Sequence, residues 1–297
     1  MNENHEYNGS IAEGGLIHVH TEMSEDAILS LEEIGEYMRD HLRSEYFVVN
    51  DHLTSPYKGK SYSEAEIQEI IEEMLSRIAR YNESHDRPKC VSGIEANIIT
   101  DGIDIPDELL AKIDFVIASR HFPWGNENPA QITQNLILAM ANPNIDAVGH
   151  INSYVDQPID WNLIFQTAEN TNTIIEINFN EPPSTEILRI MSKYKIMYSI
   201  GVDFHTFQGL KNRMPIDSDV VIDFAEAKRM AKSQEDVAIK MKQQYMDEPV
   251  GFDVLKQLIN LMKQLEYHGI SLDKVVNVRS LDSFLALIKT PKSQRIL

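Results

Sequence analysis

The stretch GLIHVHTEMSEDA, residues 15–27, decides how this chain can be interpreted. Its first half, LIHVH, has the pattern of a buried strand. Because side chains alternate between the two faces of a strand, His18 and His20 are predicted to point the same way. Acidic residues follow directly, in TEMSED. Two imidazoles on one face indicate either a metal site or a coincidence, and the rest of the chain must decide between them.

The composition narrows the class of protein. The 297 residues include a single cysteine, Cys90, in an apolar setting where we expect it to be buried. One cysteine, no signal-peptide pattern and no apolar run of membrane-spanning length predict a soluble cytoplasmic protein. The formal net charge of −19 argues against nucleic acid as a partner. It does not exclude a small phosphorylated substrate, because cations inside a site can reverse the local field.

Short apolar runs rich in valine and isoleucine alternate with longer helical patterns. This alternation predicts an α/β protein with a parallel, doubly covered sheet, most economically a (β/α) barrel. The predicted strands span residues 16–20, 46–51, 89–98, 114–121, 146–150, 173–178 and 197–205. The predicted helices between them span residues 30–42, 61–84, 106–113, 128–142, 160–170 and 184–194.

The chain shows no composition shift that would mark a domain boundary. We therefore predict one domain over residues 1–297, with a barrel core at about 15–206 and a helical C-terminal part at about 207–297. This C-terminal part is longer than closing a barrel requires. A lid, a face for homo-oligomer contacts, and plain packing all remain open as its role.

Potential metal ligands recur at the ends of the predicted strands. Six of the seven strands carry one at or near the C-terminal end, and in a parallel barrel those ends meet at one rim. Nitrogen and oxygen donors without sulfur suit zinc, manganese or iron rather than calcium. The candidates are His18, His20, Asp51, His52, Glu95, His121, His150, Asp203 and His205.

The motifs HVHTEMSED, NDHL, GIEANI, ASRH, VGHIN and GVDFH occur in this order over residues 15–206. Together they resemble the polymerase and histidinol phosphatase (PHP) family. The segment GIEANIITDGIDIPDELLAKIDFVIASRHF looks especially like the PHP module of bacterial family-X DNA polymerases and PHP-type histidinol phosphatases. The resemblance implies a distorted (β/α)7 TIM-like barrel, here with a helical C-terminal extension, that holds two or three divalent ions.

The resemblance also implies how the ligands are shared. One ion would take His18, His20, Glu95 and Asp203. Glu95 would bridge to a second ion held by His121 and His150. The third would take His52, His205 and an acid from the loop, either Glu25 or Asp26. We favour Asp26, because S-x-D-A looks like the phosphatase-type spelling.

Clustered divalent ions activate water and neutralise phosphate oxygens, so a metal-bridging hydroxide is the expected nucleophile. Asp51 and Asn178 are candidates for orienting the imidazoles; an ordinary cap or strand-end role is the alternative for each. Cations that might meet the substrate phosphate, with a structural or solvated role as the alternative, are Arg120, Lys58, Lys60, Lys211 and Arg213.

The leading hypothesis is a metal-dependent phosphoesterase that hydrolyses a small phosphate monoester. A phosphodiesterase or exonuclease acting on nucleic-acid ends is the second, and a non-catalytic, metal-stabilised binding module is the third. One departure from the family spelling is GVDFH, where Val202 and Phe204 replace the usual small residues around Asp203. The substrates of relatives are therefore not transferred to this chain.

Overall fold

The computed structural model describes residues 14–24, 26–53, 62–100, 102–121, 128–151, 158–178, 183–205 and 251–295. Nine strands in these residues form one curled sheet in the order β3-β2-β1-β9-β8-β7-β6-β4-β5, and every pair is parallel except β4 with β5. The strands are β1 (Gly15–Val19), β2 (Tyr46–Val49), β3 (Lys89–Val91), β4 (Gly93–Ile99), β5 (Gly102–Ile103), β6 (Phe115–Ser119), β7 (Ala147–Val148), β8 (Ile174–Asn178) and β9 (Tyr198–Phe204).

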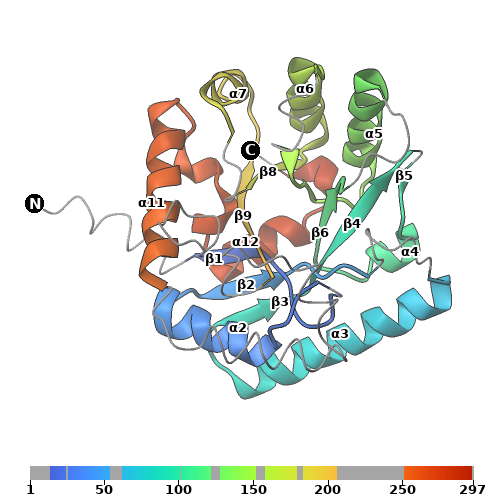
Figure 1. Ribbon diagram of the computed structural model, residues 1–297, viewed down its shortest axis with the longest axis vertical. Helices are drawn as coiled ribbons and strands as arrows, with labels where there is room; N and C mark the ends of the chain where they lie inside the picture. The colour runs from blue at the N-terminus through green and yellow to red at the C-terminus, as the bar shows by residue number, and fades with distance from the viewer. Residues whose placement is uncertain are drawn as a thin grey trace, which may run out of the picture.

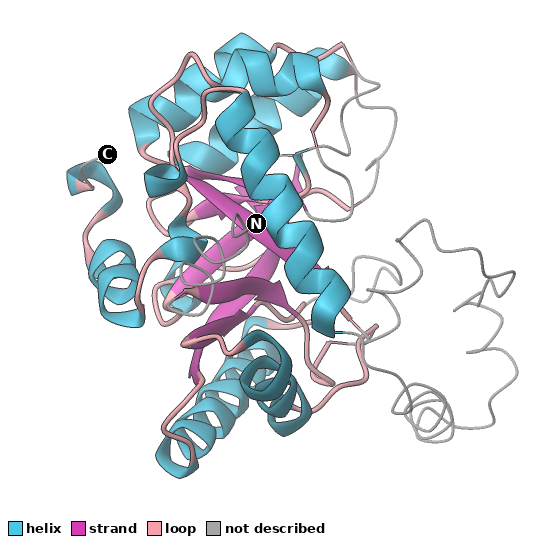
Figure 2. Ribbon diagram, turned by 90° about the vertical axis from the view of Figure 1, so that its left-hand side faces the viewer, coloured by secondary structure: helices cyan, strands magenta, loops and turns pink. Residues whose placement is uncertain are grey.

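Helices surround this sheet, with the strands lying between them (Figures 1 and 2). They are α2 (Leu31–Tyr37) with the π-helical turn η1 (Met38–Leu42), α3 (Glu64–Ser84), α4 (Asp107–Leu110), α5 (Pro129–Ala141), α6 (Trp161–Thr171), α7 (Thr185–Met191), α11 (Gly251–Tyr267) and α12 (Leu281–Lys289). Short 3-10 turns are η3 (Leu272–Lys274), η4 (Val276–Val278) and η5 (Lys292–Gln294). The predicted fold class, a distorted TIM-like barrel with a helical C-terminal part, is confirmed.

The third predicted strand, residues 89–98, is wrong as a single strand. It divides at Ser92 into β3, which pairs with β2, and β4, which pairs with β6. At Ser92 the chain passes from one pairing to the other, and the Ser92 hydroxyl exchanges hydrogen bonds with Asp114, at 2.6 Å to the carboxylate and 3.1 Å from the backbone N–H. A parallel bridge between Asp51 and Ile94 then joins the end of β2 to β4 and closes the barrel.

Two helices begin with a capping box. Ser30 before α2 and Ser63 before α3 each accept a hydrogen bond from the backbone N–H three residues on, while Glu33 and Glu66 reach back to the cap N–H. These reciprocal bonds satisfy donors that a helix start otherwise leaves unpaired.

The C-terminal part packs against the end of the barrel opposite to the predicted ligands. The ring of Phe284 in α12 stacks on Tyr46 at the start of β2, with centroids 4.9 Å apart, and also contacts Phe115 at the start of β6. All three are fully buried. Packing is therefore a role of residues 251–295, whereas residues 206–250 lie outside the described ones. Cys90 is 3% exposed, as expected for a core residue.

Asn277 inserts its side-chain amide between two central strands. Its Oδ1 accepts from the backbone N–H of Ile200 at 2.6 Å, and its Nδ2 donates to the carbonyls of Ile200 and Gly15 at 3.0 and 3.2 Å. The amide thus completes the backbone pairing of β9 and β1 where η4 passes beneath them.

We expect Asn277→Ala to lower the free energy of unfolding by about 3 kcal/mol, because buried backbone groups would lose their partners. Chemical denaturation measures this change. The matched control is Gln264→Ala, which removes an exposed amide from α11 and should change the unfolding free energy by less than about 0.5 kcal/mol. Equal unfolding free energies for the two variants would contradict this role for Asn277.

No helix among the described residues combines the length and apolar character needed to cross a membrane.

Candidate metal centre

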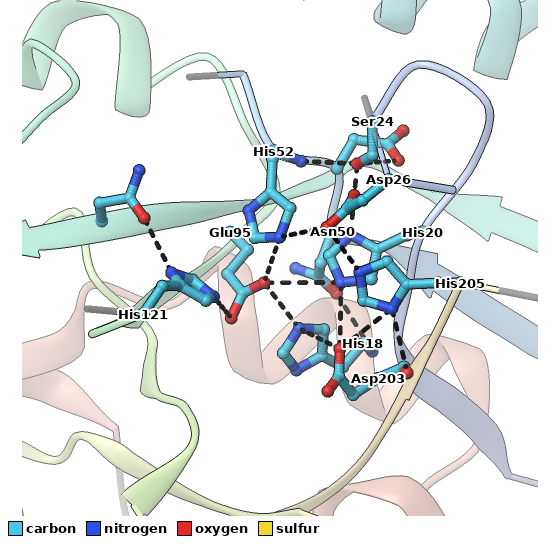
Figure 3. A network of polar contacts seen from close by, with 12 residues as sticks. His18, His20, Ser24, Asp26, Asn50, His52, Glu95, His121, Asp203 and His205 are labelled. Atoms are coloured by element: carbon cyan, nitrogen blue, oxygen red, sulfur yellow. Dashed lines mark hydrogen bonds and ion pairs between the residues drawn. The ribbon is translucent and has the colours of Figure 1, made fainter. Parts of the chain in front are cut away.

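Glu95, a fully buried carboxylate on β4, stands at the centre of the imidazoles at the C-terminal rim (Figure 3). Its two oxygens lie 3.0 to 3.5 Å from the Nε2 atoms of five histidines. Oε2 is 3.0 Å from His18, 3.3 Å from His52 and 3.5 Å from His20, and Oε1 is 3.1 Å from His150 and 3.2 Å from His121. These five side chains come from the ends of four different strands, as the sequence predicts.

Two further carboxylates complete the ring. Asp203 on β9 places Oδ1 3.4 Å from Nδ1 of His205 and 3.6 Å from Nε2 of His20. Asp26 places Oδ2 3.3 Å from Nε2 of His205 and 3.9 Å from Nε2 of His52. Asp26 thus lies where the sequence expects the loop ligand of the third ion, while Glu25, the alternative, lies outside the described residues.

The donor set fits divalent ions. Buried donor atoms at the centre have no hydrogen-bond partner, namely Nε2 of His18, His20, His121 and His150 and both oxygens of Glu95. Such atoms are costly to bury unless something binds them. Ligands 2.0–2.1 Å from a tetrahedral zinc are about 3.4 Å from one another, which is close to the separations around Glu95. His18, His20 and Glu95 form one group of donors close enough to share an ion, and His52, Glu95 and His121 form another.

The imidazoles of the ring differ in the direction in which their pKa values are shifted. Burial lowers the pKa of His52 to about 4 and that of His20 well below its usual value. Burial also disfavours charge on His150, but attraction to Asp203 and Glu95 outweighs it and raises the pKa of His150 to about 9. Without an ion, therefore, some imidazoles carry protons that compensate the central carboxylates, as expected of a site built for positive charge.

Most of the imidazoles are fixed through Nδ1, which leaves Nε2 directed at the centre. Nδ1 of His121 lies 2.8 Å from Oδ1 of Asn97, and Nδ1 of His20 lies 3.3 Å from Oγ of Ser24. Asn178, predicted to orient an imidazole, has Nδ2 3.4 Å from Nδ1 of His150. Such contacts hold the orientation of the ring in metal sites, and an acceptor such as Oδ1 of Asn97 also keeps the proton on Nδ1.

Asp51 acts one step further from the imidazoles than predicted. Its carboxylate accepts from the backbone N–H and hydroxyl of Thr21, at 2.6 and 2.7 Å, and from the hydroxyl of Ser24 at 3.0 Å. The Ser24 hydroxyl in turn accepts from the backbone N–H of His52 at 2.8 Å. The Asp51 carboxylate therefore fixes the loop after β1 and reaches His52 through the Ser24 hydroxyl, while the Asp51 backbone carbonyl accepts from the N–H of Glu95 at 3.2 Å.

His18 and His20 both point to the centre, but not because side chains alternate along a regular strand, as the sequence predicts. The register of β1 shifts between Leu16 and Val19 against β2, and His18 has a left-handed φ of 68°. Its backbone N–H leaves the ladder and donates to Oδ1 of Asn50 at 3.1 Å. Left-handed backbone also occurs at His150 (φ 51°) and Asp203 (φ 49°). Non-glycine residues in this region cost about 1–3 kcal/mol each and concentrate at functional sites.

Sequence reasoning missed four polar residues that contact the ligand-bearing ones. They are Ser24, Asn50, Asn97 and Glu176. The signal available for Glu176 was its charge inside the apolar run TIIEIN, since an acid in a buried strand requires a partner.

Of the predicted phosphate-contacting cations, only Arg120 lies among the residues that the structure describes. Arg120 is half-buried directly after β6 ends, and Lys58, Lys60, Lys211 and Arg213 lie outside the described residues. Val202 packs in the outer core, away from the ring, and nothing is described of the Phe204 side chain.

Comparison with known proteins gives relatives of two kinds. The DNA polymerase/3′-5′ exonuclease PolX of Bacillus subtilis is 27% identical over 213 residues, which cover 66% of this chain and 35% of the relative. A probable phosphatase of Caldicellulosiruptor saccharolyticus is 36% identical over 126 residues, which cover 38% of this chain and 52% of the relative. The resemblance to the PHP family is confirmed. The chain spans only about a third to a half of the length of these curated relatives.

Two further comparisons gave no match or only a weak one. No protein-family model matches the chain. The histidinol phosphate phosphatase of Lactococcus lactis, solved with zinc, L-histidinol and phosphate, is 16% identical, with a TM-score of 0.45. The match covers 65% of this chain and 86% of the phosphatase. Similarity at that TM-score supports no conclusion about activity.

Proposed function

We propose that this protein is a metal-dependent phosphoesterase that hydrolyses a small phosphate monoester. The observation that carries the proposal is the Glu95 carboxylate, which faces the Nε2 atoms of five imidazoles at 3.0–3.5 Å inside a fully buried centre. A non-catalytic binding module would not require so many convergent donors at the C-terminal rim, where barrel enzymes place their active sites.

In this proposal three groups of residues hold zinc, manganese or iron. His18, His20, Glu95 and Asp203 form the first group. Glu95, His121 and His150 form the second, and His52, His205 and Asp26 the third. Bound ions would supply an activated water nucleophile and neutralise the phosphate oxygens. The contribution of the chain is to keep the Nε2 atoms of the imidazoles directed at the carboxylates of these groups.

The net negative charge of the chain favours a small substrate over a nucleic acid. A net charge of −19 repels a phosphate polymer over most of the surface. The likeness to PolX, named as a 3′-5′ exonuclease, favours hydrolysis of phosphodiesters as the second candidate function. The two functions differ in which ester the same centre hydrolyses.

Metal content and ester preference test the proposal together. Protein purified without chelator should contain two or three transition-metal ions per chain by mass spectrometry. It should hydrolyse p-nitrophenyl phosphate faster than bis-p-nitrophenyl phosphate or the 3′ end of a single-stranded oligonucleotide. Faster turnover of the diester or the oligonucleotide would favour the second function. Folded protein that stays metal-free and inactive after manganese or zinc is supplied would overturn both.

A further inference from the structure

Glu176 on β8 is a buried charge that the proposed metal groups do not use. The side chain is completely inaccessible to solvent. Because side chains alternate along a strand, Glu176 shares the barrel-interior face with Ile174 and Asn178, while Ile175 and Ile177 pack in the outer core. An unused carboxylate so close to Glu95 and Asp203 is electrostatically costly, so it requires a specific role.

Both oxygens of Glu176 are engaged, each with a different part of the rim. Oε2 makes a short contact with Nδ1 of His18. Oε1 accepts a hydrogen bond from the backbone N–H of His150 at 3.2 Å. One carboxylate therefore connects the ends of β1 and β7 from behind the ring of donors.

The contact with His18 determines what that imidazole can offer. Nε2 of His18 faces Glu95 at 3.0 Å and can bind an ion only if the proton resides on Nδ1. A carboxylate at Nδ1 selects this tautomer and makes Nε2 a better donor. Glu176 supplies that carboxylate without pointing into the centre itself.

The contacts also lie at two strained backbone positions. His18 and His150 both have left-handed φ values, 68° and 51°. Such positions persist only where surrounding contacts hold them. The Glu176 carboxylate holds the ring of one and the N–H of the other.

The neighbouring strand β9 has no side chain at the position that faces Glu176. A Cβ atom built on Gly201 of β9 would collide with the Glu176 carboxylate. The φ of Gly201 is not in the left-handed region, so the absence of a side chain there serves space and not backbone freedom.

We propose that Glu176 is a positioning residue that fixes the orientation and tautomer of His18 and thereby sets the affinity of the His18, His20, Glu95 and Asp203 group for its divalent ion. The inference rests on the proposed function, since it requires that this group binds metal. It adds a determinant of metal affinity that lies outside the ligand set.

The test compares Glu176→Gln with the wild type by zinc competition against a chromogenic chelator. A glutamine has one acceptor oxygen and cannot serve both His18 and His150. The ion of the His18, His20, Glu95 and Asp203 group should bind about 10- to 100-fold more weakly than in the wild type. In zinc-saturated protein the Nδ1 proton of His18 should give a downfield proton resonance, and this resonance should move upfield in the variant.

Two further variants separate the position of the Glu176 carboxylate from a general loss of negative charge. Glu45→Gln removes a carboxylate that also joins two segments, Arg87 at 2.9 Å and the Leu281 N–H at 3.0 Å, at the opposite end of the barrel. It should leave zinc affinity unchanged. Gly201→Ala keeps the Glu176 charge but displaces it, and should weaken the same ion as Glu176→Gln does.

The possible outcomes separate the two proposals. Wild-type protein that binds no zinc overturns the proposed function, and the inference with it. Wild-type binding with equal affinity and an unmoved resonance in Glu176→Gln overturns the inference alone. Complete loss of the ion from Glu176→Gln at saturating zinc also overturns it, because Glu176 would then be a ligand itself.

Discussion

Replacing Glu95 with glutamine should lower phosphate monoester turnover by about a thousandfold, since several kcal/mol of metal-centred stabilisation would be lost. The amide keeps the shape of the side chain but removes the charge that faces five imidazoles. It also places an NH2 group, which cannot bind an ion, among the Nε2 atoms of the imidazoles. The measurement is kcat for p-nitrophenyl phosphate together with the number of ions per chain, which should fall by at least one.

The matched control is Glu69→Gln, which makes the same chemical change at an exposed position on α3. It should retain wild-type turnover and metal content. Circular dichroism and thermal unfolding of both variants show whether the fold is kept. Turnover of Glu95→Gln within threefold of the wild type, with a full complement of ions, would rule out Glu95 as the central ligand.

Chelated protein should be most stable near pH 6.5 and lose stability on either side. The folded pKa of His150 is raised to about 9 from an unfolded value of about 6.5. Its contribution, about 3 kcal/mol, is therefore complete below pH 6.5 and is lost as the pH rises through 9. The folded pKa of His52 is lowered to about 4, so its burial in the neutral form costs stability as the pH falls from 6.5 to 4.

Metal should remove the alkaline loss of stability. An ion replaces the protons on the imidazoles, and it binds more tightly as the pH rises because the ligands must be deprotonated. The difference in melting temperature between zinc-loaded and chelated protein should thus widen from pH 6.5 to 9. Thermal unfolding at half-unit pH steps measures it. A gap that stays constant or narrows would contradict the proposed coupling between ion binding and these imidazoles.

Sequence pattern and parallel topology predicted most of the order of strands and helices, and which ligand-bearing residues meet at the rim. Buried parallel strands need continuous apolar runs, and the Ser-x-x-Glu pairs that cap α2 and α3 are local in sequence, so both kinds of signal can be found without coordinates. Parallel topology then brings strand ends to one rim, so that His52, Glu95 and His121 could be predicted to lie at the same rim.

Features that depend on partners distant in sequence became visible only in the tertiary structure. The predicted strand divides at Ser92, whose hydroxyl contacts Asp114, and Asn277 is buried because β1 and β9 pass above it. The bulge at His18 depends on Asn50 and Glu176, which are 32 and 158 residues away. Local pattern cannot reveal such contacts, because the free energy that holds a strained or charged residue in place comes from side chains that the fold alone brings near.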